Sequence, residues 1–424
     1  MRARTFLLIA AVVAIAATAA PASADAGDVD LTFGDRGLVT TFPNGSIAYG
    51  TAIDDRGRIV VAGSTFDAKG IDVAVARFRR SGAPDPTFGG TGRVRLDLGA
   101  QEFAVGVALT SDGRIVVVGR RSTPTRDRLF ALRLRAGGRP DPGFGNDGVA
   151  LLDLGKRFQG ANAVALTQSD RIVIGGWVSG GSTSRTAVAK LLRDGRPDTS
   201  FSGDGWTTLG FSEGDEHASD LLVLGEGHVV LAGQADIGGA SRFLLARVRA
   251  DGRLDRSFGT QEGFTLTDLG PGPDVAHAIA RDADGRLVLA GRSADGGAGR
   301  WGVTRYGPRG RPDATFGDRG RLILRFTDEA EEAHDVITLP SGRIVLAGRI
   351  ANAKGNLDMA VVRLRPDGRR DRNFGRNGIV RIDVFGSTDV GRSLVRQSDG
   401  RFVVAGEAWR GGSPRFAAAR VLPS

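Results

Sequence analysis

The chain has 424 residues, a formal net charge of +9 and no cysteine, so disulfides, thiol catalysis and Cys-ligated metals are excluded. The basic residues are mostly arginines that alternate with aspartates along the whole chain, and only 6% of the residues are aromatic. Nucleic-acid binding favours clustered basic side chains and aromatic stacking platforms. The composition therefore argues against a nucleic-acid partner.

Residues 1–24 have the composition of a secretory signal peptide. Arg2 and Arg4 precede the apolar stretch FLLIAAVVAIAATAA, and Ala22-Ser23-Ala24 fits the small-residue cleavage pattern. A membrane-spanning helix needs about 20 apolar residues, more than this stretch offers, and no later segment is apolar enough. We therefore expect the mature chain, residues 25–424, to be secreted to the outside of the cell or, alternatively, to the periplasm, without a membrane span.

A motif of Asp, Phe and Gly follows directly and recurs seven times, as in DPTFGGTG at 85–92. The distances between successive phenylalanines are 55, 56, 57, 57, 58 and 58 residues, and an aspartate lies three residues before each one. Such a regular period indicates a repeat architecture. The seven pairs are Asp30 and Phe33, Asp85 and Phe88, Asp141 and Phe144, Asp198 and Phe201, Asp255 and Phe258, Asp313 and Phe316, and Asp371 and Phe374.

Each repeat contains four short segments typical of strands. In the second copy these are FAVGVAL at 103–109, a β-branched run at 115–118 that ends on a glycine, LFALRLR at 129–135 and VALLDL at 149–154. The dipeptide Asp112-Gly113 predicts a tight hairpin turn between the first two. No segment has a sustained helical period. The equivalent glycines that end the second strand are Gly63, Gly119, Gly176, Gly233, Gly291, Gly348 and Gly406.

Seven copies of a four-stranded unit predict an all-β fold, a seven-bladed β-propeller of antiparallel blades that forms a single domain over residues 25–424. One blade alone cannot bury both faces of its sheet, whereas a ring of blades can. The chain starts with one strand, 37–42, and its last repeat ends after only three, the last at 416–422. We expect strand 37–42 to complete the C-terminal blade and close the ring.

The repeated motif fits a structural turn between the third and fourth strands. Its glycines allow a tight reversal, its aspartate can cap the turn, and its phenylalanine can pack between blades. A basic residue lies eight positions before six of the seven aspartates, and a seventh lies near the C-terminus, so we expect an ion pair, bidentate where the residue is Arg, in every blade. A calcium loop is the alternative, but the copies at 88–92 and 258–263 lack enough oxygen ligands. The basic residues are Arg77, Arg133, Lys190, Arg247, Arg305, Arg363 and Arg420, of which the last is expected to pair with Asp30.

The succession DxTFGxxG, DGRIVVAG and AVARLRADG resembles the delta-60 repeat family, bacterial exported proteins with a β-propeller domain. Seven concordant copies cover nearly all of residues 25–424. The resemblance implies a propeller in the cell envelope or outside the cell. It implies no catalytic residues.

The first strand of each repeat carries the candidate site. Aligned on the hairpin turn, these strands show a column of small residues followed by two mixed columns that contain polar side chains. His277, His334 and Asp335 are candidates for acid–base catalysis at the mouth of the central channel. Two histidines do not make up a metal set, so we predict neither a metal nor a cofactor. The candidate ligand-binding residues are Tyr49, Asn162, Asp220 and Arg392.

Two functions remain open at this point. The first is a non-catalytic binding or scaffold module, expected to be a monomer, whose ligand is an envelope glycan or protein. The alternative is a hydrolase or lyase that uses the polar ring at the channel mouth. If the protein only binds, we expect a wide, hydrated channel in which the polar side chains point apart. If it is an enzyme, we expect His277, His334 and Asp335 to lie within hydrogen-bond distance of one another in a pocket.

Overall fold

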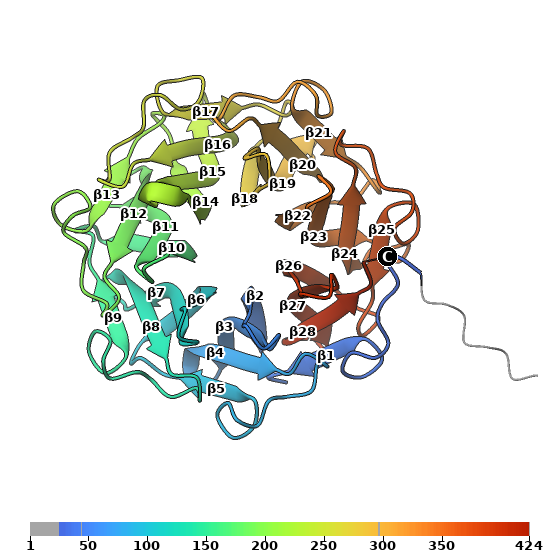
Figure 1. Ribbon diagram of the computed structural model, residues 1–424, viewed down its shortest axis with the longest axis horizontal. Coiled ribbons are helices and arrows are strands. Elements are labelled where there is room, and N and C mark those ends of the chain that lie inside the picture. Colours follow the sequence, from blue (N-terminus) through green and yellow to red (C-terminus); the bar gives the residue numbers. More distant parts are fainter. Residues whose placement is uncertain (1–24, 44, 296, 424) are drawn as a thin grey trace, which may run out of the picture.

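The computed structural model describes residues 25–43, 45–295 and 297–423. Within these ranges, seven four-stranded antiparallel sheets stand around one axis as the blades of a β-propeller (Figure 1). The predicted fold class is confirmed, and the single helical segment described is the 3-10 turn η1, Gly225–Gly227. The predicted signal peptide lies outside the described residues. No helix in the described ranges is long and apolar enough to cross a membrane.

The strands of blades 1 to 6 run outward from the axis in chain order, and in blade 7 the first strand of the chain is the outermost. The two inner strands of blades 1 to 7 are β2 (Ser46–Ile53) and β3 (Ile59–Asp67), β6 (Gln101–Leu109) and β7 (Ile115–Ser122), β10 (Phe158–Leu166) and β11 (Ile172–Ser179), β14 (Glu216–Val223) and β15 (Val229–Ile237), β18 (Asp274–Arg281) and β19 (Leu287–Asp295), β22 (Glu332–Thr338) and β23 (Ile344–Ala351), and β26 (Asp389–Arg396) and β27 (Phe402–Arg410). The two outer strands are β4 (Gly70–Phe78) and β5 (Arg93–Leu96), β8 (Asp127–Leu134) and β9 (Val149–Leu152), β12 (Ser184–Leu191) and β13 (Trp206–Leu209), β16 (Ala240–Val248) and β17 (Phe264–Thr267), β20 (Ala298–Tyr306) and β21 (Arg321–Leu324), β24 (Leu357–Leu364) and β25 (Ile379–Ile382), and β28 (Ser413–Val421) and β1 (Leu38–Thr41).

The ring closes as predicted, through hydrogen bonds between the two ends of the chain. β1 is the outermost strand of blade 7 and pairs antiparallel with β28, in a register that places Leu38 opposite Ala419 and Thr41 opposite Phe416 (Figure 1). Just before β1, the amide of Asp30 donates to the carbonyl of Arg420 over 2.8 Å. The last blade therefore consists of three C-terminal strands and one N-terminal strand.

One predicted boundary is wrong. The second strand of each blade was expected to end at its glycine, yet β7 continues from Gly119 to Ser122, and β3 continues from Gly63 to Asp67. The glycine therefore lies inside the strand. The glycine is not needed for a turn. It is needed because the backbone of the innermost strand passes too close to leave room for a Cβ.

The ion pair between the basic residue and the motif aspartate is present in every blade. In the six arginine copies Nε lies 2.7 to 2.9 Å from Oδ2 of the aspartate. In blade 3, Lys190 Nζ lies 3.6 Å from Asp198 Oδ2. The expected bidentate geometry is wrong for most copies, because Oδ1 instead accepts the backbone N–H two residues further on, as from Thr87 to Asp85 over 3.1 Å. Both carboxylate oxygens thus hold the turn, which supports the structural role over a calcium loop.

The same arginine extends to the next blade. Arg77 Nη1 donates to the carbonyl of Ala136 over 2.5 Å, and Arg420 Nη1 donates to that of Arg80 over 2.6 Å. The guanidinium also stacks over the motif phenylalanine of its own repeat, 4.5 to 4.8 Å from the ring centre in the six arginine copies. One side chain therefore couples the turn, the aromatic ring and the neighbouring blade.

The motif phenylalanines pack between blades as expected. Phe88 is fully buried in a cluster formed by Val60 and Val75 of blade 1 and by Ile115 and Leu132 of blade 2. Each such ring contributes about 2 to 3 kcal/mol by removing apolar surface from water. The hydrophobic core is thus divided among the blade interfaces.

Most of the arginines after the first hairpin turn also bind motif aspartates. Arg401 Nε lies 2.8 Å from Asp30 Oδ2, and Arg343 Nε lies 2.9 Å from Asp371 Oδ2. Most motif aspartates are therefore held by two cations, one buried and one at the surface.

Replacing Asp30 by Asn tests the closure of the ring. The change removes the charge partner of Arg420 and one of the two charge partners of Arg401, the other being Asp399. It leaves the buried Arg420 guanidinium uncompensated, so the free energy of unfolding should fall by about 3 kcal/mol. The measurement is chemical denaturation at neutral pH. The matched control is Asp198→Asn in blade 3, where the buried partner is the more distant Lys190. A loss for Asp30→Asn no larger than that of the control would contradict a special role in closure.

Candidate functional site

Every innermost strand carries one β-bulge at the same position. In β2 the register passes from Ala48 opposite Gly63 directly to Gly50 opposite Ala62, so Tyr49 is an extra residue without a partner. A bulge breaks the alternation of the pleat and redirects side chains. The first mixed column of the sequence is therefore the column of bulge residues. Its members are Tyr49, Val105, Asn162, Ser219, His277, His334 and Arg392.

The bulges explain the glycines in the second strands. A Cβ on Gly176 would lie 1.9 Å from the carbonyl oxygen of Gly160 in the adjacent inner strand. At the six equivalent glycines, the corresponding distance is 1.9 to 2.1 Å. Only glycine fits this close approach of two backbones.

The predicted site residues come together in one cavity. A space of about 180 Å³ at the centre of the ring is lined by the bulge residues and by the residue that follows each of them. All seven candidates line it: Tyr49, Asn162, Asp220, His277, His334, Asp335 and Arg392. The sequence therefore located the ring of side chains, but it did not show what each side chain contacts.

Asp220 and Asp335 bind the backbone of the next blade. Asp220 Oδ2 accepts the N–H of Ile279 over 2.9 Å, and Asp335 Oδ2 accepts that of Leu394 over 2.5 Å. The other oxygen of each carboxylate accepts the amide of the residue that follows it. Asn162 likewise donates to the carbonyl of Ala218 over 2.8 Å. All three side chains connect blades, and in Asp220 and Asp335 both carboxylate oxygens are already occupied by backbone amides.

Burial makes Asp220 and Asp335 weaker acids than an exposed aspartate. Burial raises the pKa of Asp220 to about 6 and that of Asp335 to about 7, although the backbone N–H groups oppose the shift. The charge of Asp220 adds to the increase at Asp335. Asp335 is therefore partly protonated near neutral pH, but its two amide contacts keep it in the channel wall and away from the histidines.

Arg392 is neutralised within the protein. Its Nε and Nη2 lie 2.6 and 2.7 Å from the two carboxylate oxygens of Glu407, and its guanidinium lies 5.0 Å from the ring centre of Tyr49. This bidentate pair uses the planar fork that would otherwise hold a ligand carboxylate. The predicted anion-binding role of Arg392 therefore has little geometric support.

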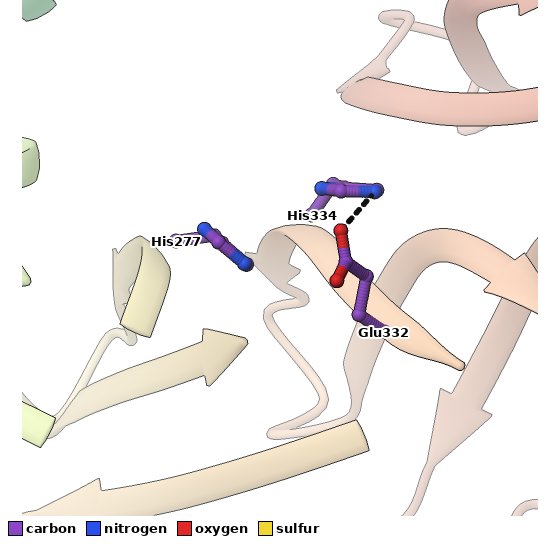
Figure 2. A group of neighbouring side chains, drawn as sticks. All are labelled: His277, Glu332 and His334. Carbon is purple, nitrogen blue, oxygen red and sulfur yellow. Dashed lines mark ion pairs between the residues drawn. The ribbon is translucent and has the colours of Figure 1, made fainter. Parts of the chain in front are cut away.

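His277 and His334 converge, and they are joined by a residue that the sequence did not single out. Their ring centres lie 5.4 Å apart, and Glu332 Oε1 lies 3.0 Å from Nε2 of His334 (Figure 2). Glu332 and the bulge residue His334 both belong to β22, whereas His277 is the bulge residue of β18 in the preceding blade. The i, i+2 spacing was the signal available, but Glu332 precedes the columns that were aligned.

Burial lowers the pKa of both histidines, that of His277 to about 4, with a further contribution from the neighbouring His334. Burial acts to raise the pKa of Glu332, but the contact with His334 and nearby positive charge outweigh it and hold that pKa well below its usual range. The lowered pKa values favour neutral imidazoles beside one carboxylate at neutral pH. The remaining histidine of an inner strand, His217, stands apart, with Nε2 2.7 Å from Ser184 Oγ.

A second column that the sequence analysis missed fixes the loops at the mouth. At the start of each innermost strand, a buried polar side chain lies two residues before the small residue that precedes the bulge, such as Ala48 in β2. Most of these polar side chains accept backbone N–H groups from the loop before the strand. Glu216 Oε1 accepts the amide of Phe211 over 2.6 Å, and Asp389 Oδ2 accepts that of Val384 over 2.7 Å. The mouth loops are thus held on a rigid frame. The column consists of Ser46, Glu102, Gln159, Glu216, Asp274, Glu331 and Asp389.

A larger groove lies away from the channel. It has a volume of about 980 Å³ and is lined by two turns of blade 6, with Arg343, Arg369 and Arg372 among their residues, and by Thr315, Gly317, Leu322 and Leu324 of blade 5. Arg343 pairs with Asp371 in its wall. The groove lies on the face opposite the mouth, because both turns follow strands that run away from the mouth.

A family model described as Domain of unknown function (DUF5122) beta-propeller matches seven segments, which together make up more than half of the chain. The chain belongs to this family. The first six matches end at the motif phenylalanine, so the DUF5122 repeat has the same phase as the period found in the sequence. The matched segments are residues 57–88, 110–144, 168–201, 226–258, 283–316, 339–374 and 397–424.

Solved structures with a similar fold include catalytic and non-catalytic propellers. A catalytically inactive virginiamycin B lyase from Staphylococcus aureus with quinupristin is 10% identical, with a TM-score of 0.49 and coverage of 91% of this chain and 98% of that one. Sqt1 from Chaetomium thermophilum bound to the N-terminus of ribosomal protein L10 is 12% identical, with a TM-score of 0.49 and coverage of 89% and 97%. The polysaccharide lyase Uly1 is 10% identical, with a TM-score of 0.44 and coverage of 96% and 94%.

At these identities and with TM-scores below 0.5, the likenesses say nothing about the ligand or activity of the DUF5122 chain. No curated protein matches it. The argument about function therefore depends on the geometry of its own site.

Replacing Gly176 by Ala tests the need for glycine beside the bulge. The added Cβ would collide with the carbonyl oxygen of Gly160, so the free energy of unfolding should fall by about 3 kcal/mol. The control is Gly181→Ala in the hairpin that follows the same strand, where nothing lies within 4 Å of the added atom. Denaturation of both variants makes the comparison. Equal stabilities would show that the bulge relaxes without cost.

The raised pKa of Asp335 predicts a pH-dependent stability. Because the folded state holds this proton more tightly than the unfolded chain, its contribution is largest below about pH 4 and is lost as the pH rises through about 7. Between pH 4 and 7 the free energy of unfolding of the native protein should therefore fall by about 3 kcal/mol relative to that of Asp335→Asn. Denaturation curves at several pH values provide the measurement. The control is Asp112→Asn at the surface. The lowered pKa of Asp112 confines its titration to below about pH 4, so between pH 4 and 7 the profile of this variant should follow that of the native protein.

Proposed function

We propose that the protein is an exported, non-catalytic binding or scaffold module that presents its mouth face to an envelope glycan or protein. The observation that carries the proposal is that most polar side chains of the ring are already used by the protein. Asp220 and Asp335 hold the backbone, and Arg392 is paired with Glu407. Such groups can neither exchange protons with a substrate nor bind one without first breaking the frame.

The size of the channel supports the same proposal. At about 180 Å³ the central cavity is smaller than the about 300 to 1,000 Å³ of pockets that enclose small-molecule ligands. A ligand larger than a few atoms would therefore contact the rim, where the mouth loops are fixed by the buried polar column. Rigid loops reduce the ordering cost of binding.

The rim also carries exposed apolar side chains. Phe158 begins β10 of blade 3 with 46% of its surface exposed, and Ile237 ends β15 of blade 4 with 41% exposed. Both positions belong to the mouth face, because β10 starts there and β15 ends there. Exposed aromatic and aliphatic side chains on a rigid frame are suitable contacts for a sugar face or a protein partner.

A hydrolase or lyase is the second candidate. The observation in its favour is the convergence of His277 and His334, whose ring centres lie 5.4 Å apart beside the cavity. The third member expected for catalysis, Asp335, does not join them. We therefore rank catalysis below binding.

The location and assembly state belong to the same proposal. We infer from residues 1–24 that the chain is exported, to the outside of the cell or, alternatively, to the periplasm. As a separate part of the proposal, the chain acts as a monomer. The repeats are of the delta-60 type by their motif, a finer assignment within the β-propeller family.

A binding screen of residues 25–424 against cell-wall glycans and polar metabolites tests the proposal. Phe158→Ser and Ile237→Ser should each weaken binding of a ligand at least tenfold, because they remove apolar contact at the rim. The matched control is Leu151→Ser, which is 44% exposed on the outer strand β9 and should leave the affinity unchanged. The double variant His277→Ala and His334→Ala should also bind normally. Turnover of a bound ligand that this double variant abolishes would establish the enzyme instead.

A further inference from the structure

The cluster of His277, Glu332 and His334 combines the ligand types of a transition-metal site. Each residue offers one ligand atom, and these atoms all lie within 4.8 Å of one another. We propose that the three side chains bind one divalent metal ion of the zinc class at the edge of the central channel. The sequence alone offered two histidines, and the third ligand became visible only when β22 placed Glu332 beside them (Figure 2).

An unpartnered buried atom points to the same place. Nε2 of His334 is buried and makes no hydrogen bond of acceptable geometry within the described part of the chain, although Glu332 Oε1 lies 3.0 Å away. The side chain of His334 is only 10% exposed. A buried nitrogen without a partner carries a free-energy cost, because it has lost its hydrogen bond to water. A metal ion between the nitrogen and the carboxylate would remove that cost.

The distances suit a metal after a small adjustment. Zinc binds imidazole nitrogen and carboxylate oxygen at about 2.0 to 2.2 Å, which puts tetrahedral ligand atoms about 3.4 Å apart. The pair formed by His334 Nε2 and Glu332 Oε1 is already at 3.0 Å. The remaining atoms lie within 4.8 Å, so rotation of side chains on a fixed backbone is sufficient. Two neutral imidazoles and one carboxylate are typical ligands for zinc and neighbouring divalent ions.

A second residue orients the carboxylate. Arg349 Nη2 lies 3.4 Å from Oε2 of Glu332, so this oxygen is held while Oε1 faces His334. A charged or polar partner behind the ligand is a regular feature of metal sites. The other nearby arginine, Arg392, is already compensated by Glu407.

The channel provides the open coordination position. His277 and His334 line the central cavity, so the cluster is open on its channel side, while the blades surround its other side. The charges of Glu332 and Glu407 balance those of Arg349 and Arg392, so a bound dication leaves net positive charge beside the cavity. The fourth ligand is therefore expected to be an anion, either hydroxide or a carboxylate small enough for the channel.

A second group with metal-ligand character is less suitable. Asp72, Asp97 and Glu102 also bring oxygens within 4.8 Å of one another, but Arg95 already pairs with Asp72 and Asp97 is exposed. This cluster provides a control for binding at exposed acidic groups.

The experiment uses residues 25–424 without a histidine tag, stripped with a chelator and titrated calorimetrically with Zn²⁺ alone. We expect one ion per chain with micromolar or tighter affinity, and Co²⁺ should give the visible absorption bands of a bound ion. His277→Ala and His334→Ala should each reduce the affinity at least a hundredfold, and Glu332→Gln should reduce it at least tenfold. His228→Ala and Asp97→Asn should bind as the native chain does.

Circular dichroism and denaturation show whether each variant folds. If an alanine variant fails to fold, His277→Gln and His334→Gln keep a polar group of similar size and replace it in the titration. No binding by the native chain, or binding that survives in folded His277 and His334 variants or is lost in Asp97→Asn, would overturn the proposal. Because the titration uses the metal alone, its outcome is independent of whether the rim binds a glycan or protein.

Discussion

The buried contact between a basic side chain of the third strand and the motif aspartate is the interaction on which the rest of the structure depends. In blade 1, Arg77 holds Asp85 through Nε, stacks on Phe88 and donates to the carbonyl of Ala136 in the next blade. A turn, an aromatic wedge and a blade interface are therefore stabilised together. Repeated around the ring, this contact fixes both the spacing of the blades and, at Asp30, the closure between the two chain ends.

The frame leaves one column free to vary. The glycine opposite each bulge, such as Gly63 beside β2, is required by the approach of two backbones, and the small residue before the bulge packs tightly. The bulge residue itself has no strand partner and faces the channel, so its side chain can change without disturbing the ladder. A sevenfold scaffold can thus carry an asymmetric centre, from Val105 in blade 2 to His277 in blade 5.

Polar character alone does not identify the working groups of this centre. Asp335 has the strongly raised pKa often associated with active sites, yet both of its oxygens accept backbone amides and it serves to join blades 6 and 7. His334, in contrast, has a buried Nε2 that lacks a hydrogen-bond partner and faces the carboxylate of Glu332. Unused bonding capacity is therefore a better guide here than perturbed acidity.

The sequence by itself determined the number of blades, the completion of the last blade by β1, the pairing of Arg420 with Asp30 and the ring of channel residues, because each depends on a period or spacing that recurs along the chain. Only the tertiary structure decided that Gly119 lies inside β7, that Arg392 is paired with Glu407 and that Glu332 joins the two histidines. These features depend on a bulge and on side chains from neighbouring strands and blades. Local patterns do not encode such contacts, since they arise only when the ring brings separate strands into contact.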